Sequence, residues 1–285
     1  MTQLVELRDR IEEFDAAGIR VYGVSYDPQV ALKRFSDKNG LTYDLLSDAG
    51  SVVVRRFGIL NTVIDPDDPR AGPFYGIPFP GTYVVDESGV VTEKFFNRHY
   101  ATRASAGTIL DKTLGRVLVH EESPQAAHLD ERVKIAAFLS DKDLTLETVS
   151  TLHVRLEMAD GLHVYAEPLP EGFHATTVTV QPSPGMRIGE PIYPPTTPKR
   201  FEALGVTLNV YEGVVDVAVP VTRTAELERV FDLRRRLGFS ERKTVDFQIV
   251  VKHQACSATV CYPPRTERLR VSVPTAELVM PLFEP

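Results

Sequence analysis

The chain is poor in several features, and each shortage narrows what the protein can be. Only two cysteines occur in 285 residues, so a network of disulfides does not hold this fold together. No apolar run reaches the roughly eighteen residues that a membrane-spanning helix needs. Positive charge is scarce as well, with 32 Lys and Arg against 39 Asp and Glu and a formal net charge of −7. This balance argues against a surface that binds nucleic-acid phosphates.

Helix and strand patterns alternate over the first part of the chain. Apolar residues at three- and four-residue steps predict an amphipathic helix over Thr2–Ala17, and a β-branched run predicts a strand over Ile19–Val24. Pro28 and Gly40 bracket a second predicted helix over Gln29–Asn39. The remaining predictions are a strand over 43–46, a helix over 51–57, a loop over 61–80, a hairpin over 82–85 and 90–96, and a helix over 102–114. This order is typical of a layered α/β domain, which we place at 1–116.

The pattern changes to period two beyond residue 132. Apolar and polar residues alternate over 151–158, 206–210, 245–251 and 269–273, and Gly-bearing turns separate these segments. Half-buried strands at such spacing predict an all-β sandwich over 132–285. One helix is predicted within it, over Ala225–Leu237, with Arg234–Arg236 on a solvated face. The mixed segment 117–131 is predicted to link the two domains.

The two cysteines lie close together in the sequence. Cys256 and Cys261 flank four residues between two predicted strands, so a tight connection would bring their Cα atoms near each other. A closed loop of about six residues contributes only about 2 kcal/mol in the chain-entropy model, which makes it a weak structural crosslink and a reasonable redox switch. An unpaired or passive cysteine pair is the alternative. No second Cys or His pair has ligand spacing, so no metal or cofactor is expected.

The residues around these cysteines resemble a known family. Residues 254–264 (QACSATVCYPP) and 161–165 (GLHVY) resemble the N-terminal domain of the thiol:disulfide interchange protein DsbD, an immunoglobulin-like sandwich. The resemblance implies that Cys256 and Cys261 are the redox pair, that Cys261 forms mixed disulfides with partners, and that Tyr262 and Pro263 shape the segment. This chain departs from the family in a gap one residue shorter and in having no membrane domain after it, so the electron donor is open.

The first domain resembles a second family. Residues 80–86 (PGTYVVD) and 88–91 (SGVV) resemble the AhpC/TSA peroxiredoxins of the thioredoxin-like group. The resemblance implies a cis bond at Pro80, beside the active cysteine, with Thr82 following it in the strand. The family's catalytic cysteine precedes the helix that is here Thr2–Ala17, and this chain lacks it together with the first strand. Peroxidase activity is therefore not expected; a misplaced start codon and a degenerate binding domain are the two explanations.

A few other residues have alternative interpretations. His153 and His163 fall on predicted strands and are expected to face solvent. His253 lies three residues before Cys256 and would either stabilise a thiolate or be a strand neighbour of no special role. Tyr165 would either pack beside the cysteine segment or fill the sandwich core.

Together these features predict a thiol–disulfide oxidoreductase with a thioredoxin-like protein as its thiol or disulfide partner. The alternatives are a non-enzymatic partner-binding module and a fragment of a longer peroxidase or antioxidant protein. No nucleic acid and no membrane span is expected. The start of the chain lacks the apolar core of a secretory signal, which favours the cytoplasm, whereas the DsbD resemblance favours a compartment outside it.

Overall fold

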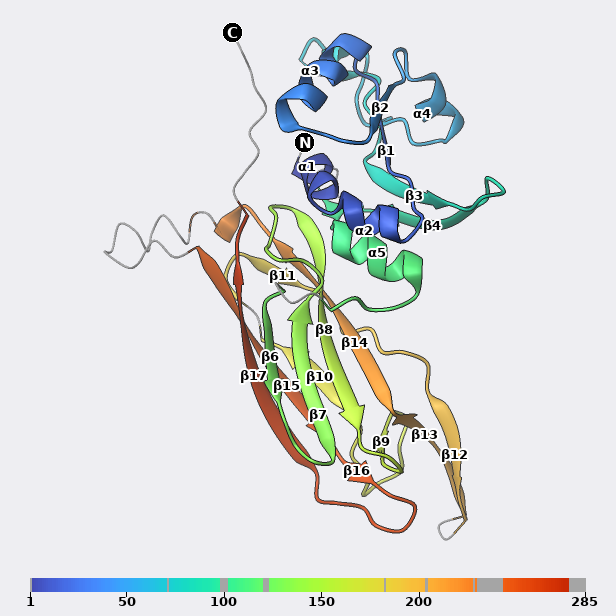
Figure 1. Ribbon diagram of the computed structural model, residues 1–285, viewed down its shortest axis with the longest axis vertical. Coiled ribbons are helices and arrows are strands. Elements are labelled where there is room, and N and C mark those ends of the chain that lie inside the picture. The colour runs from blue at the N-terminus through green and yellow to red at the C-terminus, as the bar shows by residue number, and fades with distance from the viewer. Residues whose placement is uncertain are drawn as a thin grey trace, which may run out of the picture. The chain divides into compact units, whose positions relative to one another are not determined.

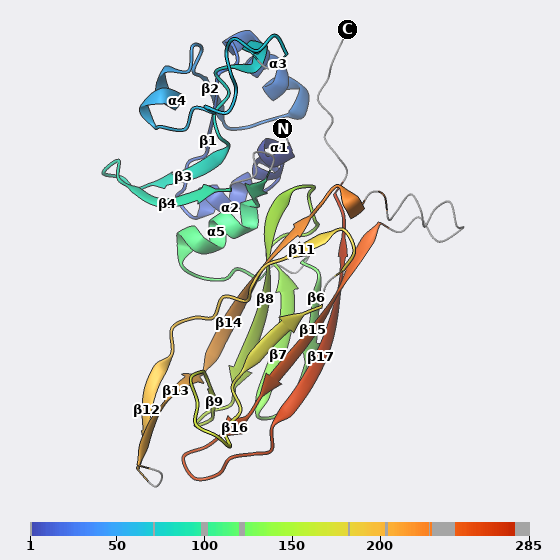
Figure 2. The same cartoon turned by 180° about the vertical axis from the view of Figure 1, so that it is seen from behind.

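The computed structural model describes residues 2–70, 72–97, 102–119, 123–181, 183–202, 205–227, 229 and 243–276. The chain divides into two compact units, Met1–Arg116 and Val117–Glu277. Figures 1 and 2 show helices gathered in the first unit and long strands in the second. Among the described residues, no helix is both long enough and apolar enough to cross a bilayer.

The first unit mixes short helices with short strands. Its elements are α1 (Thr2–Asp9), α2 (Ile11–Ala16), β1 (Tyr22–Ser25), α3 (Gln29–Asn39), β2 (Asp44–Ser47), α4 (Val52–Arg56), η1 (Gly72–Phe74), β3 (Gly81–Val85), β4 (Val91–Phe96), β5 (Arg103–Ala104) and α5 (Ala106–Leu114). β1 and β2 pair in parallel, and β3 and β4 form an antiparallel hairpin. The layered α/β organisation predicted from the alternating pattern is therefore present.

Local signals set the helix boundaries in this unit. α3 begins after Pro28, which has extended backbone, and ends at Gly40, whose φ of 60° is the left-handed conformation that glycine adopts without a Cβ clash. Ser105 caps α5 by accepting a hydrogen bond from the backbone N–H of Thr108 at 3.1 Å. The helix predicted over 2–17 is instead two helices, because the backbone leaves the helical conformation at Arg10.

The second unit is a β-sandwich. Its strands are β6 (Gln125–His128), β7 (Val133–Leu139), β8 (Thr148–Met158), β9 (His163–Tyr165), β10 (Thr177–Val180), β11 (Met186–Ile188), β12 (Thr197–Phe201), β13 (Val206–Glu212), β14 (Val214–Arg223), β15 (Thr244–His253), β16 (Ala255–Cys256) and β17 (Arg265–Pro274). One sheet has the order β11-β14-β8-β7-β6 and another the order β10-β15-β17. A further sheet, in the order β12-β13-β9-β16, lies at one end of the sandwich in both views (Figures 1 and 2).

The period-two pattern explains the core of this unit. Inward residues of β15 and β17 alternate with outward polar ones, and the inward residues from Val245 to Val251 and from Leu269 to Val273 are at most 7% exposed. They pack in one hydrophobic cluster with residues of β7, β8 and β14. Burying a large aliphatic side chain stabilises the fold by about 1.5–3 kcal/mol, so this cluster is the main source of stability in the sandwich.

Three further predictions can be compared with the structure. Within the predicted linker 117–131, Gln125–His128 form β6 and pair with β7, so this part of the segment belongs to the sandwich sheet. The predicted helix over Ala225–Leu237 and the run Arg234–Arg236 lie mostly or wholly outside the described residues. The cis bond implied at Pro80 is wrong: Glu167–Pro168 is the cis bond among the described residues. The Phe79–Pro80 bond has the trans form, which is the lower-energy isomer of an X–Pro bond. The Phe79 N–H donates a hydrogen bond to the Ile59 carbonyl at 2.6 Å.

Candidate redox site

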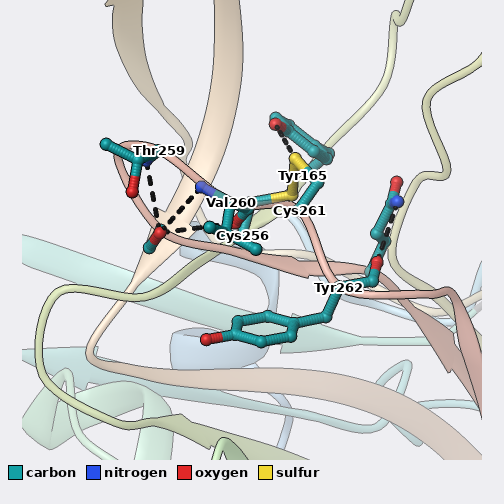
Figure 3. Close-up of a disulfide and its surroundings, with 8 residues drawn as sticks. Tyr165, Cys256, Thr259, Val260, Cys261 and Tyr262 are labelled. Carbon is teal, nitrogen blue, oxygen red and sulfur yellow. Dashed lines mark hydrogen bonds between the residues drawn. A yellow bond between two sulfur atoms is a disulfide. The ribbon is translucent and has the colours of Figure 1, made fainter.

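The two cysteines are joined by a disulfide across a tight hairpin (Figure 3). The strand β16, which carries Cys256, lies at one end of the sandwich (Figures 1 and 2). Cys256 and Cys261 face each other as an antiparallel bridge. Backbone hydrogen bonds flank the pair, from Ser257 N–H to the Val260 carbonyl at 2.8 Å and from Tyr262 N–H to the Ala255 carbonyl at 2.9 Å. The cysteines thus occupy a non-hydrogen-bonded position, where opposite Cα atoms are closest. Their Cα atoms are 4.1 Å apart.

Ser257 shapes the turn between the cysteines. Its side-chain oxygen accepts hydrogen bonds from the backbone N–H groups of Thr259 at 3.2 Å and Val260 at 3.0 Å. A serine hydroxyl that bonds the backbone two and three residues later is a common way to stabilise a turn. The sequence interpretation did not single out Ser257, although a serine directly after the first cysteine was the signal available.

The two sulfurs differ sharply in exposure. Cys256 is fully buried at 0% exposure, whereas Cys261 is exposed, as are Ala258, Thr259 and Val260 of the turn. A thiolate from another molecule can therefore reach Cys261 but not Cys256. This asymmetry assigns different chemical roles to the two sulfurs in any exchange reaction.

Tyr165 of β9 contacts the exposed sulfur. Its hydroxyl lies 3.4 Å from Cys261 Sγ, and because a disulfide sulfur carries no hydrogen, the phenol is the donor. The ring is 1% exposed and packs edge-on against Phe173 at 5.1 Å between centroids, with Phe201 at 6.0 Å. Burial raises the pKa of Tyr165, so its hydroxyl stays protonated near neutral pH. Of the two alternatives for Tyr165, packing beside the cysteine segment is the one observed.

Tyr262 and Pro263 directly follow the exposed cysteine, and contacts with the sandwich hold Tyr262 in place. The Tyr262 carbonyl accepts a hydrogen bond from Gln254 Nε2 at 3.0 Å, and its ring lies under the Arg132 guanidinium, 4.3 Å from the ring centroid. A cation over an aromatic face at this distance is attracted to the ring. Pro263 is exposed. Tyr262 therefore anchors the second arm of the hairpin to the sandwich.

His253 is buried beside a cluster of charged groups. It is 4% exposed, and burial is the largest cause that lowers its pKa. Its electrostatic neighbours are Glu267, Arg265, Asp130 and His128.

The expectation that His153 and His163 face solvent is wrong. His153 is 3% exposed and stacks on Phe138, with ring centroids 5.5 Å apart. His163 is fully buried and lies directly opposite Cys256 in the β9–β16 register. His163 was missed as a site residue, although its position two residues before Tyr165 on one strand places both side chains on the same face.

Pro80 and Thr82 stand in the first unit, which contains no cysteine. Thr82 pairs with Phe95 in the β3–β4 hairpin and is half-buried. Pro80 directly precedes β3. Neither residue has a thiol within its own unit on which to act.

The fold and the site together define a layered α/β unit and a β-sandwich that carries a hairpin disulfide. Residues 1–94 match the model of the AhpC/TSA family, and residues 136–272 match the model of the thiol:disulfide interchange protein DsbD, N-terminal. The two resemblances drawn from the sequence are thereby confirmed. The first region is thioredoxin-like, and the second is the β-rich region that matches the immunoglobulin-like DsbD domain.

Curated relatives match the first region. Peroxiredoxin Q, chloroplastic, of Arabidopsis thaliana is 38% identical over 89 residues, which are 31% of this chain and 37% of that protein. The peroxiredoxin Q of Suaeda salsa is 36% identical over 96 residues, 34% of this chain and 40% of that protein. The chain spans less than half the length of these curated relatives.

Two solved structures are also similar. The N-terminal periplasmic domain of ScsB from Proteus mirabilis has a TM-score of 0.36 and 14% identity, and the match covers 52% of this chain and 51% of that one. The reduced DsbD N-terminal domain of Neisseria meningitidis has a TM-score of 0.29 and 20% identity, and the match covers 54% of this chain and 90% of that one.

Proposed function

We propose that the second unit exchanges electrons with a protein thiol partner through Cys256 and Cys261, which makes the protein a thiol–disulfide oxidoreductase. The observation that carries this proposal is a disulfide closed across a short hairpin, with one sulfur exposed and the other buried. The family match over residues 136–272 supports it. A thioredoxin-like dithiol protein is the class of partner that this chemistry suits.

The reaction follows from the exposure of the two sulfurs. A partner thiolate attacks Cys261 Sγ, a new bond forms between the partner and Cys261, and the Cys256–Cys261 bond breaks. The Cys256 sulfur leaves with the bonding electrons and takes up a proton. A second partner thiol then displaces Cys261, so the partner is oxidised to a disulfide and both cysteines end as thiols. The reverse sequence oxidises this protein and reduces the partner.

The hairpin supplies what this exchange needs. The turn held by Ser257 keeps the two sulfurs within bonding distance, so the disulfide can reform after each reduction. The Tyr165 hydroxyl donates toward Cys261 Sγ and would stabilise negative charge there. The first unit contributes no thiol of its own to this chemistry, because residues 1–116 contain no cysteine.

A redox titration tests the proposal. The protein is equilibrated in mixtures of reduced and oxidised glutathione, and free thiols are trapped with an alkylating reagent and counted by mass spectrometry. We expect one reversible transition in which both cysteines change together. A pair that stays oxidised in strongly reducing buffer, or stays reduced in mildly oxidising buffer, would contradict the proposal. The Cys261→Ser variant is the control and should show no intramolecular transition.

A further inference from the structure

We infer that His163 accepts the proton of the Cys256 thiol when this buried sulfur attacks a mixed disulfide at Cys261. The inference rests on the proposed function and assigns a residue to the step in which the buried Cys256 sulfur reacts. Cys256 is fully buried, and burial in apolar surroundings disfavours the thiolate that must do the attacking. Water cannot reach this sulfur, so a protein group has to take the proton.

The strand register places one candidate beside Cys256. Cys256 of β16 pairs with His163 of β9, and His163 in turn pairs with Glu212 of β13. Side chains directly opposite each other in antiparallel strands project from the same face, with Cβ atoms about 4.5–5.5 Å apart. Glu212, His163 and Cys256 therefore form a row across three strands on one face of the sheet.

His163 has the properties of a proton acceptor. It is 0% exposed, and neither ring nitrogen has a hydrogen-bond partner among the described residues. Buried polar groups are seldom left without a partner unless they have a further role. The ring is held by edge-on packing against Tyr165 and by Phe201, each at 5.3 Å between centroids. A free nitrogen on a fixed ring can receive a proton without rearrangement of its surroundings.

Burial and two neighbouring charges set the pKa of His163. Burial is the largest cause that lowers the pKa of His163; Lys199 lowers it further and Glu212 raises it. Lys199 Nζ and Glu212 Oε1 form an ion pair at 2.6 Å. The other titratable groups on this face are Tyr165, whose raised pKa keeps it neutral, and Cys256 itself. A neutral imidazole is the form that can take a proton.

The step balances as follows. His163 takes the proton from the Cys256 thiol, and the resulting thiolate attacks Cys261 Sγ of the mixed disulfide. The Cys256–Cys261 bond forms and the bond from Cys261 to the partner sulfur breaks. The partner leaves with the bonding electrons and is protonated by the proton that His163 accepted, so the protein is oxidised by two electrons and the partner sulfur is reduced to a thiol.

The resolving step can be observed with the probe 5,5′-dithiobis(2-nitrobenzoate). Reduced protein releases one thionitrobenzoate when Cys261 attacks the probe and a second when Cys256 resolves the mixed disulfide. In His163→Phe, which keeps an aromatic ring against Tyr165 and Phe201, we expect the second release at pH 7 to slow at least about tenfold. This expected slowing is smaller than the rate acceleration of about 10²–10⁴-fold that a positioned general acid or base usually contributes. The loss should shrink as the pH rises.

Two surface variants separate a proton-transfer role from a packing role. Glu212→Gln should move the midpoint of the pH profile of the second release to lower pH, because Glu212 raises the pKa of His163. Lys199→Gln should move the midpoint to higher pH, because Lys199 lowers that pKa. Equal second-release rates in wild type and His163→Phe, or midpoints that do not move in opposite directions, would overturn the inference. If wild type released no second thionitrobenzoate, the proposed function itself would fail.

Discussion

The contact between Tyr165 and Cys261 gives a prediction whose size can be worked out. The phenol hydroxyl lies 3.4 Å from Cys261 Sγ and is buried with the ring. In the reduced protein the same hydroxyl would donate to the Cys261 thiolate. A hydrogen bond to a charged group contributes about 1.5–3 kcal/mol, so removing it in Tyr165→Phe should lower the thiolate fraction about 10- to 150-fold.

The observed rate changes less than the thiolate fraction does. A more basic thiolate is also a stronger nucleophile, with a Brønsted coefficient of about 0.4–0.5, which offsets about half of the effect on a logarithmic scale. We therefore expect the exchange of Cys261 with a small aromatic disulfide at pH 7 to slow about 3- to 12-fold in Tyr165→Phe. At high pH, where the thiol is ionised in both proteins, the order should reverse, because the more basic thiolate of Tyr165→Phe is the stronger nucleophile.

The assay uses Cys256→Ser as the background, so that only Cys261 reacts. Stopped-flow absorbance gives the second-order rate constant with and without Tyr165→Phe. Tyr193→Phe is the matched control, since it removes the phenol hydroxyl of a half-buried tyrosine, one that accepts a hydrogen bond from the Val178 N–H at 2.8 Å. An unchanged or faster rate in Tyr165→Phe, or an equal loss in Tyr193→Phe, would refute the role given to Tyr165.

Two further predictions concern the turn and the buried histidines. Ser257→Ala removes the acceptor for the Thr259 and Val260 N–H groups. The two bonds together contribute about 1–3 kcal/mol, so in a glutathione titration the equilibrium constant for closing the disulfide should fall by about 5- to 150-fold. An unchanged constant would exclude this role for Ser257. Burial lowers the folded-state pKa of His163 and His253 below the value of 6.5 that a histidine has in the unfolded chain. Below pH 6.5 the unfolded chain therefore binds more protons than the folded protein, and the free energy of unfolding falls as the pH drops from 6.5 toward the folded-state pKa. Urea unfolding of wild type should show this loss, and a double His163→Phe and His253→Phe variant should show a flatter pH dependence; an equally steep one would contradict the assignment.

Local sequence signals predicted much of the fold. α3 was predicted with its observed bounds because Pro28 and Gly40 mark its two ends and nothing in the tertiary structure overrides them. The strands β15 and β17 followed from strict alternation of apolar residues. Prediction was weaker where a local pattern was ambiguous: residues 125–128 are short and mixed in polarity, and they become a strand only because β7 offers a free edge.

The site was only partly predictable for a similar reason. Cys256 and Cys261 are close in sequence, so their proximity could be inferred from a short connection. The row of Glu212, His163 and Cys256 depends on pairing between residues 49 and 93 positions apart in the sequence, and no local pattern encodes that register. His163 was expected to face solvent because a histidine on a strand usually does, whereas β9 is covered on both faces.

The different roles of the two sulfurs can be tested by trapping a partner disulfide on each cysteine separately. Cys256→Ser and Cys261→Ser, each reduced, are incubated with a protein of the thioredoxin class that carries only its attacking cysteine, activated as the mixed disulfide with thionitrobenzoate. Attack on the partner sulfur releases thionitrobenzoate, and the covalent complexes are resolved by non-reducing electrophoresis and mass spectrometry. We expect a mixed disulfide on Cys261 in the Cys256→Ser variant and little or none on the buried Cys256 in the Cys261→Ser variant. Equal trapping on both, or trapping only on Cys256, would contradict this expectation.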